Sequence, residues 1–113
     1  MFKHYLTYQF ALTLHQLCLL TTLADTSKKS RLIRSAEQMI HAMTLALHAP
    51  VASREGAHWF AALVNLRDCK DILEECDALD GEIETKIQIL NDRFEKLCEG
   101  VAATTDGQYK MLG

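Results

Sequence analysis

The sequence contains few of the residues that break helices, with one proline and five glycines in 113 residues. Pro50, Gly56, Gly81 and Gly100 fall near the points where the apolar pattern is interrupted. Between those points apolar residues recur every three or four positions, and no stretch alternates as a strand requires. The scarcity of turn residues therefore disfavours a β-rich fold and predicts an all-helical one.

The sequence also lacks a strong charge of either sign, since its net charge is −3 and acidic and basic residues are mixed. This is an ordinary soluble surface, without the basic balance of a protein whose main task is to neutralise phosphates. A chain of this length, half of it hydrophobic, forms one domain whose core needs neither disulfide nor metal.

Motifs for metal binding and catalysis are absent. The four cysteines, which form no Cys-x-x-Cys pair, resemble buried apolar residues of a reducing compartment: Cys18, Cys69, Cys76 and Cys98. His41 and His48 stand two helical turns apart, about 10 Å, which is too far for one metal ion. We interpret the histidines as buried or interfacial, with a pH-sensitive interface as the main alternative. We expect no metal, no cofactor and no enzymatic activity, because no Gly-x-Ser-x-Gly, Cys–His pattern or phosphate loop occurs.

No hydrophobic run reaches the roughly 18 residues that a transmembrane helix needs. The segment FALTLHQLCLLTTLA resembles the apolar part of a signal peptide, but Lys3 is the only basic side chain before it, and His15 and Gln16 interrupt it. Its spacing is more typical of an amphipathic helix. We therefore expect a cytoplasmic protein without membrane association.

The spacing predicts four helices. They cover about residues 2–24, from the 25–27 turn to 49, 53–79 and 81–103. Their apolar stripes, in chain order, are Leu6, Phe10, Leu14, Leu17, Leu20 and Ala24; Ile33, Ala36, Ile40, Met43 and Leu47; Trp59, Ala62, Leu66, Cys69, Leu73 and Cys76; and Ile83, Ile87, Leu90, Phe94, Leu97 and Val101. Asp25 and Asp80 stand where N-capping oxygens are needed. The pattern dissolves after this, so residues 1–103 form the predicted domain and 104–113 a mobile C-terminal tail.

The short joints determine the predicted topology. A helix of 23 residues is about 35 Å long, and joints of two to four residues cannot cross that distance. Consecutive helices must turn back on each other. The predicted fold is an antiparallel up-down-up-down four-helix bundle.

Three segments carry a resemblance to a known family: YQFALTLHQLC (residues 8–18), LIRSAEQMI (32–40) and ALVNLRDCKDILEECDAL (62–79). They resemble the bacterial four-helix-bundle proteins related to those encoded in 23S rRNA intervening sequences. A structural relative of that family is the accessory protein of diversity-generating retroelements, called Avd. The chain departs from the family in AMTLALHAPV (42–51), which lacks the usual Asn and acidic residue, and in its net acidity.

The resemblance implies a homo-oligomeric ring, commonly a pentamer, without a catalytic centre. For the Avd branch it also implies a reverse transcriptase and nucleic acid, RNA or DNA, as partners. We therefore expect a non-enzymatic oligomeric scaffold or accessory protein, assisting a reverse transcriptase or a structured RNA.

A basic concentration at the start of the second helix supports an alternative function, direct nucleic-acid binding. Its residues are Lys28, Lys29, Arg31 and Arg34, with Arg54 near the other end of that helix. The competing interpretation is a solvated face that balances the acidic third and fourth helices.

Apolar residues in excess of the predicted stripes indicate a subunit contact on the second and third helices. The candidate oligomer-interface residues are Met39, Ala42, Leu45, Ala46, Ala49, Trp59 and Leu63.

Overall fold

The chain folds into four helices, seen in a computed structural model that describes the backbone of residues 4–112 and the side chains of residues 4–99. They are α1 (Tyr5–Leu20), α2 (Thr26–Leu47), α3 (Ala52–Glu75) and α4 (Gly81–Leu112). No strand occurs within residues 4–112. The all-helical prediction is confirmed.

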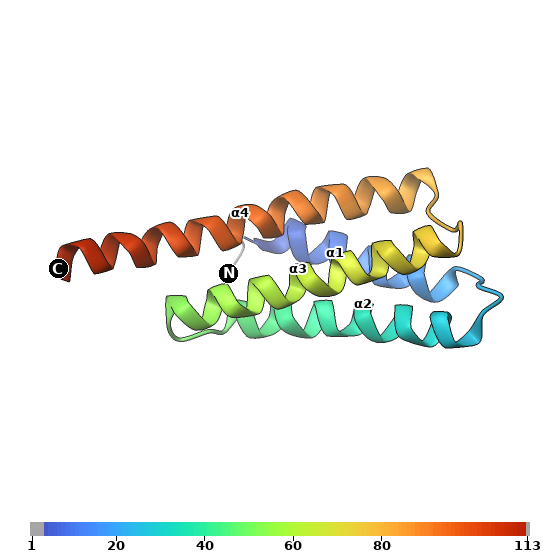
Figure 1. The fold of residues 1–113 in the computed structure, drawn as a ribbon, viewed down its shortest axis with the longest axis horizontal. Helices are drawn as coiled ribbons and strands as arrows, with labels where there is room; N and C mark the ends of the chain where they lie inside the picture. Colours follow the sequence, from blue (N-terminus) through green and yellow to red (C-terminus); the bar gives the residue numbers. More distant parts are fainter. Residues whose placement is uncertain (1–3, 113) are drawn as a thin grey trace.

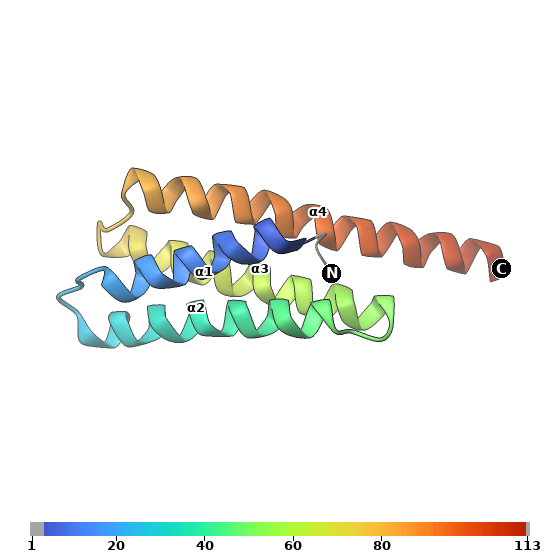
Figure 2. The same cartoon turned by 180° about the vertical axis from the view of Figure 1, so that it is seen from behind.

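Each helix packs against its neighbours in the chain, and α1 also packs against α4. Successive helices run in opposite directions (Figure 1), and α1 lies across the side between α2 and α4 (Figure 2). Within the described residues α1 has no backbone contact with α3, so these two helices stand diagonally opposite. The C-terminal part of α4 projects past the other helices, which gives the molecule a long axis of 55 Å.

Carboxylates begin two of the helices as the sequence predicts. The Asp25 side chain accepts a hydrogen bond of 3.1 Å from the backbone N–H of Lys28, and Asp80 accepts one of 2.9 Å from Ile83. Each satisfies a backbone donor that the first helical turn leaves unpaired.

The end of α3 differs from the prediction, since the helix stops at Glu75 rather than near residue 79. Asp77 adopts a left-handed backbone with φ of 54°. The N–H of Ala78 then bonds to the carbonyl of Leu73 at 2.8 Å, and the N–H of Asp77 bonds to that of Glu74 at 3.1 Å. This pair of bonds closes a helix end, usually with glycine at the left-handed position, and an aspartate there does not mark the end in the sequence.

The core is a single cluster contributed by all four helices. Trp59 is its largest side chain, and its ring centroid lies 6.0 Å from that of Phe94 and 5.4 Å from that of His4. In α3 and α4 the predicted stripes are largely confirmed, with these members buried: Trp59, Ala62, Leu66, Cys69, Leu73, Ile83, Ile87, Leu90 and Phe94.

The predicted stripes of the first two helices are partly wrong. On α1 the buried residues are Thr7, Ala11, Leu14 and Cys18, whereas Leu6 and Leu20 are 65% and 72% exposed. On α2 the buried residues are Leu32, Ser35, Ala36, Met39, Ala42, Met43 and Ala46. In both helices the inward side mixes small residues such as Ala11 and Ala42 with large ones such as Leu14 and Met39.

The predicted tail is helical where the structure describes it. The backbone of α4 continues to Leu112, so residues 104–112 extend the helix, and Gly113 lies outside the described residues. Helical hydrogen bonds do not need a periodic apolar stripe, so the helix continues beyond the end of that stripe at Val101.

Two substitutions three residues apart in the sequence around the α3–α4 turn should change stability in opposite directions. Asp80→Ala removes the N-cap of α4 and should lower the unfolding free energy by about 1 kcal/mol. Asp77→Gly relieves a left-handed non-glycine residue and should raise it by about 0.5–1 kcal/mol. Urea unfolding followed by circular dichroism measures both changes, and a destabilised Asp77→Gly variant would contradict the assigned helix end.

Candidate functional site

The predicted basic cluster is largely occupied by contacts within the chain. The ammonium of Lys29 donates to the carbonyls of Cys18 at 2.8 Å and Leu19 at 2.9 Å, and also to that of Thr21. These carbonyls belong to the C-terminal end of α1, where a cation offsets the negative end of the helix dipole. Lys29 therefore ties α1 to α2.

Two more members of the cluster pair with acidic residues of α3. The ammonium of Lys28 lies 3.5 Å from the Glu75 carboxylate, and the Arg31 guanidinium donates to Asp68. Ser35, buried on α2, donates to the other Asp68 oxygen at 2.5 Å. The basic side of α2 thus faces the acidic side of α3, as the competing interpretation of the sequence expects.

Asp68 is the centre of this contact. Burial of its carboxylate raises its pKa, but the hydrogen bonds from Ser35 and Arg31 and the charge of Arg31 outweigh that effect. The pKa of Asp68 therefore lies below its ordinary value, and the ionised carboxylate stabilises the α2–α3 pair.

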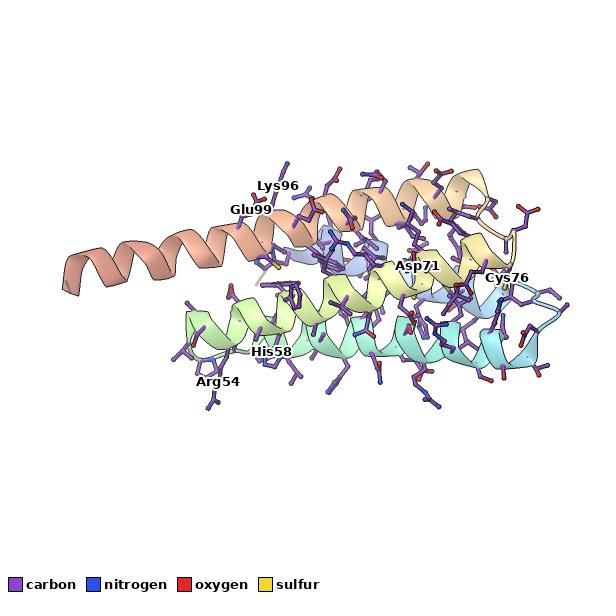
Figure 3. The ribbon with its side chains drawn as sticks, viewed as in Figure 1. Arg54, His58, Asp71, Cys76, Lys96 and Glu99 are labelled. Carbon is purple, nitrogen blue, oxygen red and sulfur yellow. The ribbon has the colours of Figure 1, made fainter. Side chains whose placement is uncertain are left out.

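The remaining members are exposed and far apart. Arg34 lines an open depression with Thr26, Ser27 and Ser30, and it has no ion-pair partner among the described residues. Arg54 lies near the start of α3, at the opposite end of the α2–α3 pair from Lys28 (Figure 3). The structure does not bring the five predicted residues into one surface.

Most of the predicted oligomer-interface residues lie inside the chain, which corrects that part of the sequence interpretation. The buried ones are Met39, Ala42, Ala46, Trp59 and Leu63. They pack in the core because the inward face of α2 is rotated from the one predicted and the inward face of α3 is wider than its predicted stripe. Leu45 is exposed and Ala49 is half-buried, so only these two contribute to the outer surface.

An apolar surface on α1 was not predicted. Along α1 a second stripe runs beside the buried one, formed by Leu6, Phe10, Thr13, Leu17 and Leu20 at alternating spacings of four and three. Phe10 and Leu17 are half-buried, Thr13 is exposed, and α1 contains no Asp, Glu, Lys or Arg. We call this stripe the α1 face.

A second apolar surface lies on the outer side of α3. Ala57, Phe60 and Val64 share one side of the helix at spacings of three and four, with Phe60 58% and Val64 49% exposed. We call these three residues the α3 face. It stands on the helix diagonally opposite α1.

The cysteines and histidines form no obvious reactive centre. A hydrogen bond to Cys18 and burial raise the pKa of Cys69 above its ordinary value, and such a thiol is unreactive at neutral pH. His41 and His48 are exposed, and the His48 ring bonds to the Thr44 carbonyl. Within the described residues no group of three or more His, Cys, Asp or Glu side chains is arranged to hold a metal ion.

Comparisons add no relative to this description: no family model, curated protein or solved structure matches the chain. Among the described residues, no helix combines the length and hydropathy needed to cross a membrane.

The contact centred on Asp68 predicts a pH-dependent loss of stability. Asp68→Asn should lower the unfolding free energy at neutral pH by about 1–2 kcal/mol, because two hydrogen bonds to a charged acceptor are weakened. Because the folded pKa is lowered, this stabilisation is present above the unfolded pKa of about 3.9 and is lost as pH falls through the folded value. Urea unfolding at a series of pH values measures it.

A matched control is Asp71→Asn, which removes an exposed carboxylate one turn further along α3. Its effect should be small at every pH. The assigned role of the carboxylate would be contradicted if the difference in unfolding free energy between Asp68→Asn and the unsubstituted chain stayed constant below about pH 4.

Proposed function

We propose that the protein is a non-enzymatic assembly module, an antiparallel up-down-up-down four-helix bundle that forms a homo-oligomer and serves as a scaffold or accessory protein. The single observation that carries this proposal is the α1 face. A helix of 16 residues without a charged side chain is typical of a helix covered on all sides. In one chain, α1 is covered only by α2, α4 and the core.

The spacing of the α1 face also favours another helix as the covering element. Alternating steps of four and three, from Leu6 to Leu20, are the pattern by which one helix packs lengthwise on another. The α3 face offers a complementary surface, because the small Ala57 next to Phe60 and Val64 lets a second helix approach. We infer that the α1 face of one copy packs on the α3 face of the next.

The placement of the two faces favours a head-to-tail assembly. A surface that packs on a different surface of an identical chain gives a ring when the rotation closes, whereas a surface that packs on itself gives a dimer. The two faces belong to diagonally opposite helices, so each copy contacts two neighbours. A ring of five is the assembly that the family resemblance implies, and a reverse transcriptase or a structured RNA is the partner that we propose on the same ground.

The size of the faces indicates a moderate affinity. Burying the exposed parts of Leu6, Leu20, Phe60 and Val64 contributes roughly 4–8 kcal/mol. Association itself costs about 4–15 kcal/mol in lost translational and rotational freedom. The four exposed side chains alone therefore do not give tight binding, so we expect assembly to depend on concentration and to need the half-buried Phe10 and Leu17 in the contact.

Charged substitutions on each face test the assembly. Leu6→Glu with Leu20→Glu, and separately Phe60→Glu with Val64→Glu, should each reduce the mass measured by light scattering, because a buried unpaired carboxylate opposes the contact. Head-to-tail packing leaves one intact face on each variant. An equimolar mixture of the two should therefore form pairs with twice the 12.8 kDa mass of one chain.

The control pair is Tyr5→Glu with Leu19→Glu, two exposed positions of α1 that stand neither three nor four residues from any member of the α1 face. It should leave the mass unchanged, and circular dichroism should report the same helix content for all variants. An α3-face variant that kept the full assembly, or a mixture that stayed monomeric, would contradict the head-to-tail arrangement.

Direct nucleic-acid binding through Lys28, Lys29, Arg31, Arg34 and Arg54 is the less favoured function. Three of these residues have partners within the chain, and a cation must break such a contact before it binds a phosphate. Of the five, only Arg34 and Arg54 are exposed without an ion-pair partner among the described residues. Salt-sensitive binding of labelled RNA that is lost in an Arg34→Gln, Arg54→Gln double variant would restore this function.

A further inference from the structure

The outer side of α2 carries a regular stripe that neither the core nor the proposed assembly uses. Within the described residues α2 packs only against α1 and α3, and its remaining side faces away from the bundle (Figure 1). Five exposed residues follow one another there at alternating spacings of four and three: Arg34, Gln38, His41, Leu45 and His48. This spacing allows two helices to pack lengthwise. We call this stripe the outer α2 face.

The His48 ring presents a free nitrogen on this face. His48 directly follows the last residue of α2, and its Nδ1 lies 2.8 Å from the carbonyl oxygen of Thr44. A carbonyl oxygen only accepts, so Nδ1 carries the proton and Nε2 of the neutral ring keeps a lone pair. Metal-binding histidines are oriented by a hydrogen bond of this kind from the other ring nitrogen. The same bond holds the ring alongside the last turn of α2.

A carboxylate stands one turn before the other histidine of the face. Glu37 and His41 are both exposed and four residues apart, so their side chains are neighbours on the helix surface. Two ligands at this spacing on one helix can bind the same zinc ion. Glu37 has no ion-pair partner among the described residues. These two residues supply an oxygen and a nitrogen, and a zinc site needs at least one more protein ligand.

The third ligand does not come from the same chain, because His48 stands about 10 Å from His41 along α2. A second copy packed antiparallel supplies it. The midpoint between the two histidines falls at Thr44 and Leu45, so a two-fold axis there places His41 of each copy opposite His48 of the other. The side chain of Leu45, which is 40% exposed, then meets its own counterpart at the centre of the contact.

The charge of the surface favours a divalent cation as the bridge. Between Ser35 and Ser53, Glu37 is the only Asp, Glu, Lys or Arg. Two copies that met here without a cation would bury two unpaired carboxylates in exchange for a small apolar contact at Leu45, which is unfavourable. A divalent ion at each site neutralises Glu37 and binds both copies, so the contact depends on the metal.

We propose that the outer α2 face is a zinc-dependent contact between two copies of the chain. Two equivalent sites are formed, each by Glu37 and His41 of one copy and His48 of the other. Two imidazole nitrogens and one carboxylate oxygen suit zinc(II), with a water molecule as the fourth ligand. The α1 face and the α3 face lie on other helices, so this inference does not rest on the assembly proposed above.

Titration of the unsubstituted chain with zinc chloride tests the site. Calorimetry should show binding that saturates at one zinc ion per chain, whereas magnesium chloride should not bind, because magnesium prefers oxygen ligands. Zinc should also at least double the mass that light scattering measures in EDTA, and renewed addition of EDTA should reverse the change.

Complementary variants test whether each site joins two copies. His41→Ala and His48→Ala should each lose saturable zinc binding. An equimolar mixture of the two combines an intact His48 with an intact His41 across the contact, so binding should return at one zinc ion per two chains. The matched control is His58→Ala, which removes a histidine of α3 outside the outer α2 face and should bind zinc as the unsubstituted chain does.

Glu37→Gln keeps the shape of the side chain and should weaken zinc binding about tenfold, which corresponds to 1.4 kcal/mol. All substituted residues of the site are exposed, so circular dichroism should report the helix content of the unsubstituted chain. The proposal is overturned if zinc binding does not saturate, if it saturates without a change in mass, or if the mixture of His41→Ala and His48→Ala binds no zinc.

Discussion

A helix that packs against two neighbours around a shared core can bury only one side, and this constraint governs how the molecule uses α1. Its inward side is formed by small residues such as Thr7, Ala11 and Cys18, which bring α1 close to the core. Its large residues Leu6 and Leu20 are left facing outward. Since α1 has no charge to solvate that outward side, the helix is more apolar than one chain requires. The proposed assembly follows from this excess.

The same packing explains why the basic residues of α2 do not form a patch. Lys29 reaches the C-terminal carbonyls of α1, while Lys28 and Arg31 reach carboxylates of α3. These contacts hold α2 between its two neighbours and orient the helices around the core. Three of the four cations at the start of α2 are thus used for structure within the chain, and among them only Arg34 has no ion-pair partner among the described residues.

The sequence predicts the number and approximate positions of the helices but not the rotation of each one. On α4, charged residues such as Glu84, Asp92 and Arg93 surround a single stripe, so the buried side was predicted correctly. On α1 no position is charged and apolar residues lie on more than one side, so spacing alone cannot decide which stripe turns inward. The end of α3 was missed because Asp77 takes a conformation that glycine usually takes. The packing of α1 against α4 joins segments about 80 positions apart in the sequence, a contact that no local pattern reveals.

The most direct test of the central claim, that the outer side of α1 is covered by another copy, is the mass of the unsubstituted chain in solution. Light scattering coupled to gel filtration measures this mass over a range of micromolar concentrations. The account predicts an integral multiple of 12.8 kDa that rises with concentration toward a fixed value, as expected for a closed assembly. A mass of 12.8 kDa at every concentration would contradict it.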